Sequence, residues 1–111
     1  MITTHVLDIA SGKPAVGVRV VLSIVRSGAR TTVASGVTDA DGRLRDLVPA
    51  TTPLEAATYE LTFETGPYFV SHGVYPFHPR VTVMFEVADP EQHHHVPLLV
   101  SPFGYTTYRG S

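Results

Sequence analysis

The sequence predicts an all-β protein, an antiparallel sandwich of seven or eight short strands with one short helix. Valine, isoleucine and threonine dominate the composition, and these residues favour pleated, half-buried backbone. In several segments apolar and polar side chains alternate with a period of two, as they do on strands that bury one face. Turn-forming residues interrupt these segments at intervals of about ten residues.

The first two strands are predicted at Ile2–Asp8 and Val18–Val25, on either side of a turn at Ser11–Pro14. The even-numbered residues of the second segment are all apolar, whereas Arg19 and Ser23 occupy odd-numbered positions. This alternation places one face of that strand in the core.

The third and fourth strands are predicted at Arg30–Thr38 and Arg43–Leu47. The dipeptide Ser27-Gly28 turns the chain into the third strand. Between the two strands, Asp39-Ala40-Asp41-Gly42 forms a tight connection, in which Gly42 supplies a positive φ. A loop is expected at Pro49–Pro53.

A fifth strand at Tyr59–Glu64 follows from the apolar residues Tyr59, Leu61 and Phe63, which occupy alternate positions. The next segment, Thr65–His72, is expected to hold a short helical turn.

The last three strands are predicted at Val81–Val87, His93–Val100 and Gly104–Tyr108. Asp89-Pro90 and Ser101-Pro102 provide the turns between them. Since domains commonly run about 100–150 residues, we expect residues 1–111 to form a single domain.

Composition excludes several classes of protein. The chain has no cysteine, which rules out disulfides, zinc fingers, iron–sulfur clusters and thiol nucleophiles. A net charge of −2 gives no basic footprint for nucleic acid, and no apolar stretch is long enough to span a bilayer. A cytoplasmic protein is expected. Only 16% of the residues are charged, which suggests that other subunits cover part of the surface.

Three adjacent histidines, His93-His94-His95, form the most unusual motif. On a strand, His93 and His95 share one face and His94 takes the other. Such a pair is a metal-ligand spacing, but it also fits a run of histidines with another role or with none. A zinc site needs a third ligand, for which His5, His72 and His78 are the candidates. Taken by themselves, an isolated histidine in a strand such as His5 is usually structural, and Arg43 after the Asp-Gly turn is by default a solvated turn residue.

Standard nucleophile, zinc-protease and phosphate-loop motifs are absent. Any catalysis must therefore use histidine, arginine, tyrosine, threonine and water. This set of residues suits general acid–base hydrolysis of an electrophilic carbonyl.

The two ends of the chain together resemble the transthyretin-like family of 5-hydroxyisourate hydrolases. The start reads Thr3-Thr4-His5-Val6-Leu7-Asp8, followed by Gly12-Lys13-Pro14-Ala15. Near the other end, His95-Val96-Pro97-Leu98-Leu99 precedes Ser101-Pro102-Phe103-Gly104-Tyr105-Thr106-Thr107 and the tetrapeptide Tyr108-Arg109-Gly110-Ser111. The tetrapeptide is the most specific part, because the hormone-carrying transthyretins lack it.

The resemblance implies a transthyretin-like (prealbumin-like) sandwich that assembles as a homotetramer, a dimer of dimers, with active sites where the dimers meet. It also implies that His5, Arg43 and His95 are catalytic, with Tyr108, Arg43 and Thr106 binding the substrate and no metal or cofactor taking part. His94 is a departure, because the family commonly has tyrosine there. We expect His94 to point away from His95.

The activity that the resemblance implies is hydrolysis of 5-hydroxyisourate to 2-oxo-4-hydroxy-4-carboxy-5-ureidoimidazoline in urate breakdown. The partners expected are this small molecule and further copies of the chain, without nucleic acid or membrane. Two alternatives remain: a transthyretin-like carrier of a small ligand, and a structural module of a larger protein. We expect any zinc or nickel captured by the three histidines to be adventitious.

Overall fold

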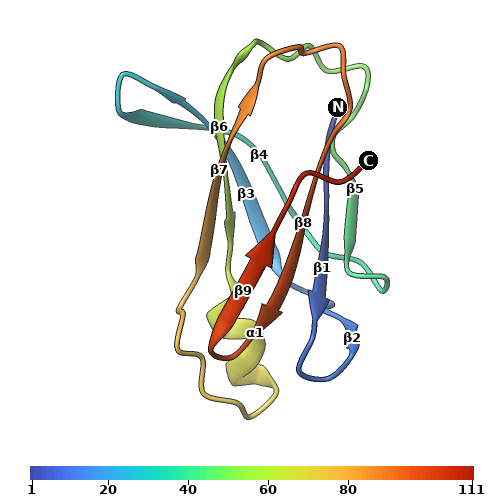
Figure 1. Cartoon of the computed structure of the whole chain (residues 1–111), viewed down its shortest axis with the longest axis vertical. Coiled ribbons are helices and arrows are strands. Elements are labelled where there is room, and N and C mark those ends of the chain that lie inside the picture. Colours follow the sequence, from blue (N-terminus) through green and yellow to red (C-terminus); the bar gives the residue numbers. More distant parts are fainter.

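The computed structural model describes residues 1–111, which form two β-sheets packed face to face and one short helix (Figure 1). The first sheet contains β1 (Ile2–Asp8), β2 (Lys13–Pro14), β5 (Arg43–Val48), β8 (His94–Ser101) and β9 (Gly104–Thr107). The second sheet contains β3 (Arg19–Arg26), β4 (Ala29–Val37), β6 (Ala57–Phe63) and β7 (Val81–Val87). The predicted sandwich is confirmed, and the predicted strand limits agree with the observed ones to within a few residues.

β1 occupies the centre of the first sheet. β8 lies along one side of it, and β5 and β2 pair with the two ends of its other side. The pairing of β1 with β8 is parallel, and every other pairing in the molecule is antiparallel. The sequence predicted antiparallel strands throughout. Alternation reveals which residues share a face but not the direction in which a neighbouring strand runs.

The two-residue strand β2 is an addition to the prediction. Lys13 and Pro14, expected in a turn, pair with Asp8 and Leu7 at the end of β1. This pairing raises the number of strands to nine.

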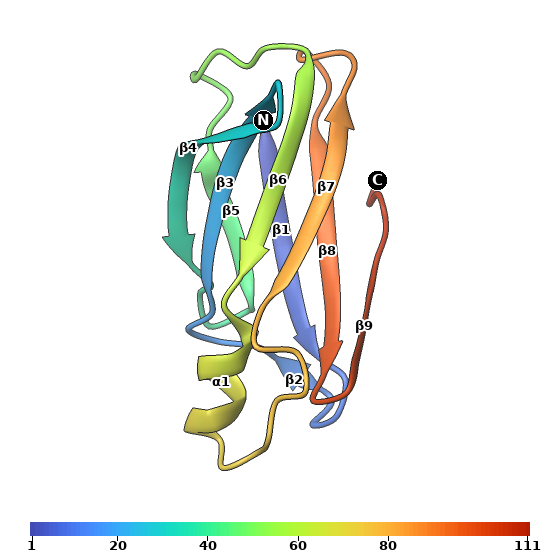
Figure 2. The same cartoon turned by 90° about the vertical axis from the view of Figure 1, so that its left-hand side faces the viewer.

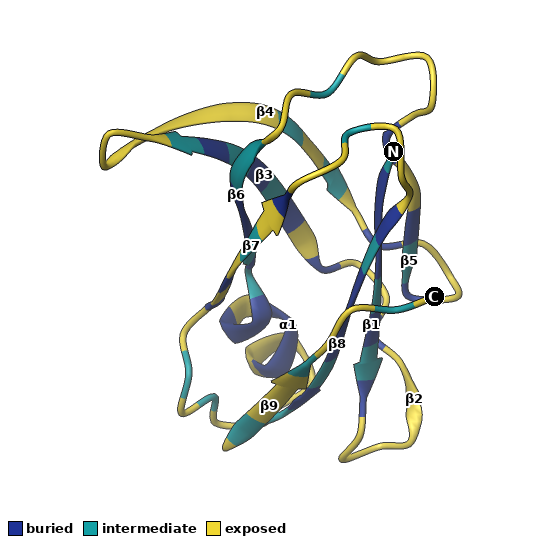
Figure 3. Cartoon of the chain, turned by 45° about the horizontal axis from the view of Figure 1, so that its top comes forward, coloured by how far each residue is buried: buried dark blue, intermediate teal, exposed yellow.

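A single cluster of 21 buried apolar residues fills the space between the sheets. In β3 the even-numbered residues Val20, Leu22 and Ile24 are buried, as the alternation predicted. Leu98 of β8 is completely buried among them. Truncating such a leucine to alanine typically costs about 2–5 kcal/mol. Figure 3 shows the buried residues on the strands that face the interior and the exposed ones along β4 and its turn.

The helix α1 (Thr65–Ser71) confirms the short helical turn predicted at Thr65–His72. It follows β6 at one end of the sandwich (Figure 2). Pro67 lies in its first turn, where a backbone N–H has no partner within a helix. The hydroxyl of Tyr68 donates to Oδ2 of Asp8 at 3.0 Å, which ties the helix to β1. This helix, the only one in the structure, is too short to cross a membrane.

Candidate active site

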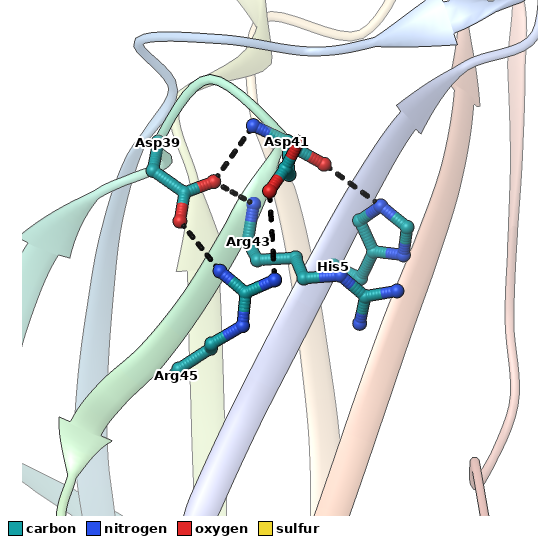
Figure 4. A network of polar contacts seen from close by, with 5 residues as sticks. All are labelled: His5, Asp39, Asp41, Arg43 and Arg45. Carbon is teal, nitrogen blue, oxygen red and sulfur yellow. Dashed lines mark hydrogen bonds and ion pairs between the residues drawn. The ribbon is translucent and has the colours of Figure 1, made fainter.

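Arg43 lies directly opposite His5, because β5 pairs with β1 in this register. The turn before β5 fixes the arrangement. Oδ1 of Asp39 accepts hydrogen bonds from the backbone N–H groups of Asp41 at 2.9 Å and Arg43 at 3.0 Å, and the Arg43 bond is the main cause that lowers the pKa of Asp39 (Figure 4). Gly42 has a φ of +74°, and a Cβ there would lie 2.4 Å from the carbonyl oxygen of Val6. The turn therefore requires glycine at this position.

His5 has a defined tautomer when it is neutral. Its Nε2 lies 2.9 Å from the carbonyl oxygen of Asp41 (Figure 4). A carbonyl oxygen only accepts, so Nε2 must carry the proton and donate it. The lone pair is then on Nδ1. Partial burial, followed by the positive charge of Arg43, lowers the pKa of His5, which favours this neutral form.

His95 joins the same face of the sheet from β8. In the parallel register, Thr3 lies opposite His95 and His5 lies opposite Pro97. Because residues two apart on a strand share a face, His5 and His95 lie on one face. Burial, then Arg43, and then His93 and His5 lower the pKa of His95. The structure thus brings together His5, Arg43 and His95, the three residues expected to be catalytic.

The segment after β9 runs back along β8 and covers His95. The N–H of Gly110 donates to the carbonyl oxygen of His95 at 2.8 Å. A Cβ at position 110 would lie 2.5 Å from Cδ2 of His95, so only glycine fits against the ring. Ser111 then reaches a pocket of about 370 Å³, which it lines together with Arg43 and His95.

Tyr108 and Thr106 do not line the pocket of Arg43, His95 and Ser111 within one chain. Tyr108 is 56% exposed and lines a second pocket, of about 220 Å³, between β7, β8 and the residues that follow β9, and His95 also lines this pocket. Thr106 is exposed and pairs with Leu99. Since directly paired residues share a face, Thr106 lies on the His95 face of the sheet. Its partner Leu99 is four residues beyond His95 along β8.

The three adjacent histidines divide as the alternation predicted. His94 is buried with the core residues of β8, and its Nδ1–H donates to the carbonyl oxygen of Gln92 at 2.9 Å. Burial is the main cause that lowers its pKa. His93 and His95 lie on the opposite face with ring centres 6.2 Å apart. No group of three or more metal-binding side chains in the structure is arranged to hold an ion.

Sequence reasoning did not identify two polar groups that hold the histidines. One is the carbonyl of Asp41, which bonds His5. The other is the hydroxyl of Thr3, which lies 2.7 Å from Nδ1 of His95. Position alone gave a hint, because Thr3 precedes His5 by two residues and must share its face. The parallel register that brings His95 beside Thr3 was needed to see its role.

Comparison with known proteins agrees with this geometry. Residues 2–110 match the model of the HIUase/Transthyretin family. A protein of Deinococcus radiodurans named 5-hydroxyisourate hydrolase is 48% identical over 113 residues, which cover 99% of this chain and 95% of that protein. The structure of Klebsiella pneumoniae 5-hydroxyisourate hydrolase superposes with a TM-score of 0.86 at 42% identity, and covers 99% of this chain and 98% of its own. Sea bream transthyretin in complex with thyroxine gives a TM-score of 0.88 at 35% identity, with 98% and 93% of the two chains covered.

Proposed function

Because this chain belongs to the HIUase/Transthyretin family, we propose that it hydrolyses 5-hydroxyisourate to 2-oxo-4-hydroxy-4-carboxy-5-ureidoimidazoline in urate breakdown. The observation that carries the proposal is the placement of His5, Arg43 and His95 on one sheet face, in a chain 48% identical to a protein of that name. Neither a metal nor a cofactor enters the proposed reaction. Residues 1–111 act as one hydrolase domain.

In the proposed mechanism His5 is the general base. Its Nδ1 holds the free lone pair, and its lowered pKa keeps that lone pair available near neutral pH. Nδ1 takes a proton from water, and the water oxygen attacks the carbonyl carbon of the cyclic amide. Such general acid–base assistance is worth about 10²–10⁴-fold in rate.

Arg43 and His95 act on the other side of the reaction. The planar guanidinium of Arg43 donates two parallel hydrogen bonds to substrate oxygens, where negative charge develops as water attacks. His95 donates a proton to the ring nitrogen as the carbon–nitrogen bond breaks, which opens the ring. Lysine cannot supply the paired donors, so Arg43→Lys should lose activity.

A second copy of the chain completes the proposed site. Tyr108 and Thr106, the further substrate-binding residues, do not line the pocket of Arg43 and His95 within one chain and are exposed for contact with another. The sheet face around His95 also presents Leu99, which is only partly buried in the single chain. We propose a homotetramer of two dimers in the cytoplasm, with the sites where the dimers meet.

The decisive experiment follows the ultraviolet absorbance of freshly made 5-hydroxyisourate. The wild-type protein should speed its decay well beyond the rate in buffer, and His5→Ala and His95→Ala should each lower kcat by about 10²-fold. The double variant should be little worse than either single one, because members of one acid–base unit are not additive. Decay at the buffer rate would remove the hydrolase from consideration.

The similar sea bream transthyretin was solved in complex with thyroxine, which favours one alternative function, a carrier of a small ligand. A carrier would deplete free ligand without forming product. Product analysis by mass spectrometry therefore separates the two functions.

A further inference from the structure

The hydroxyl of Thr3 lies between two imidazole rings. Its Oγ1 is 2.8 Å from Nε2 of His93 and 2.7 Å from Nδ1 of His95. Both distances are those of hydrogen bonds. Two bonds need two protons, and the hydroxyl carries only one. One of the two facing nitrogens must therefore be protonated while the other offers a lone pair.

We propose that Thr3 and His93 are positioning residues that form a proton relay to His95, an inference that rests on the hydrolase function proposed above. The relay connects the buried side of His95 to His93, whose side chain is exposed. It supplies a proton to Nδ1 of His95 as His95 gives its Nε2 proton to the ring nitrogen of the substrate. The hydroxyl of Thr3 is 2.7 Å from Nδ1 of His95, so the route runs through Thr3.

The relay begins with His93 protonated on both nitrogens and His95 protonated on Nε2. The ring nitrogen of the substrate takes the proton from Nε2 of His95, and Nδ1 of His95 takes the hydroxyl proton of Thr3. The Thr3 oxygen in turn takes the proton from Nε2 of His93. Thr3 ends unchanged, His95 ends as the other neutral tautomer, and His93 ends neutral and regains a proton from solvent.

The charges around the pocket explain why a relay is useful. The charged and titratable residues that line it or act on it are Met1, His5, Arg43, Arg45, His93, His95 and Ser111. Burial and the positive charge of Arg43 hold the pKa of His95 below its ordinary value, so a proton stored on His95 is disfavoured. A relay allows His95 to act as an acid while the positive charge stays on the exposed ring.

The test replaces the hydroxyl while keeping the shape of the side chain. Thr3→Val should lower kcat by roughly 10- to 100-fold with little change in KM, a loss typical of removing the partner that orients a functional histidine. Thr3→Ser keeps the hydroxyl and should restore most of the rate. His93→Gln should lower kcat to a similar extent as Thr3→Val. The control is Thr4→Val, since the neighbouring Thr4 hydroxyl bonds the carbonyl of Val96 and no histidine.

Nitrogen-15 NMR of the imidazoles, without substrate, tests the relay independently of activity. In the wild type and Thr3→Ser, Nδ1 of His95 and Nε2 of His93 should show complementary protonation, and in Thr3→Val this complementarity should be lost. The same nitrogen spectra in wild type and Thr3→Val would overturn the relay, whatever the rates. A wild-type protein that does not hydrolyse 5-hydroxyisourate would overturn the proposed function instead, and the NMR result would still report on the coupling.

Discussion

The carbonyl of Asp41 decides which nitrogen of His5 can accept a proton, and Arg43 adds to burial in lowering the pKa of His5. Both depend on the turn Asp39–Gly42, whose glycine admits the sharp change of direction and whose Asp39 holds the Arg43 backbone. The sequence identified His5 and Arg43 through a family resemblance. It could not assign the tautomer of His5, because the partner is the backbone carbonyl of Asp41, and every residue type has such a carbonyl.

Removing the Arg43 charge should raise the pKa of both site histidines. Burial is the larger cause of the lowered pKa values, so Arg43→Gln should move them only part of the way to about 6.5. The measurement is NMR titration of the imidazole protons. Arg43→Lys keeps the charge and should leave both pKa values low.

Arg45→Gln is the matched control for this titration. Arg45 lowers the pKa of His5 less than Arg43 does, and it is not among the main causes that act on His95. If Arg45→Gln raised the pKa of His95 as much as Arg43→Gln does, the electrostatic role assigned to Arg43 would be wrong.

At the scale of elements, the alternation of apolar residues predicted where the strands lie, but it did not predict which strands pair with each other. His95 could be placed on a strand and on a face from the sequence. Its position beside Thr3 depends on the parallel pairing of β1 with β8, which is set by how the whole sandwich closes. The extra strand β2 escaped prediction because two residues carry no periodic pattern.

The segment after β9 should tolerate no side chain where it crosses His95. Gly110→Ala places a Cβ 2.5 Å from the imidazole, so the segment or the ring must move. We expect kcat to fall by roughly 10-fold or more, as expected when a functional histidine loses its orientation, with little change in Tm.

Gly104→Ala controls for the loss of a glycine nearby. A Cβ at position 104 meets nothing closer than 3.9 Å, at Oγ of Ser101. This variant should keep its activity. Equal activity in Gly110→Ala and wild type would show that the segment does not position His95.

At the scale of the whole molecule, stability should decline in acid because His94 is buried in its neutral form. Its pKa is lowered in the folded protein, so the unfolded chain binds its proton more tightly. Stability is therefore fully present above about pH 6.5 and is lost as the pH falls towards the lowered value.

His94→Tyr should remove part of this acid sensitivity. A tyrosine stays neutral in acid, and the pocket of about 220 Å³ beside His94 offers room for the larger ring. Thermal unfolding between about pH 5 and pH 8 should show a flatter dependence of Tm on pH in the variant. Above about pH 7 the two proteins should differ by a constant offset. Parallel curves over the whole range would mean that His94 does not couple folding to pH.

Assembly gives a prediction of its own, since the proposed site draws residues from more than one copy. Sedimentation should show a homotetramer. Dilution below the dissociation constant of the tetramer should lower the specific activity in step with the tetramer fraction. The fraction of tetramer and the rate of hydrolysis can be measured on the same samples. A monomer with full activity would place the complete site within one chain.

The parallel pairing of β1 with β8 also has a consequence for synthesis on the ribosome. Thr3 must wait for His95, its partner across the sheet, until about 90 further residues have been translated. During that interval β1 lacks its neighbour β8, although β5 can already pair with the other side of β1. A nascent chain that exposes only the first sixty or so residues would thus hold an unfinished sheet edge, the kind of surface that recruits chaperones.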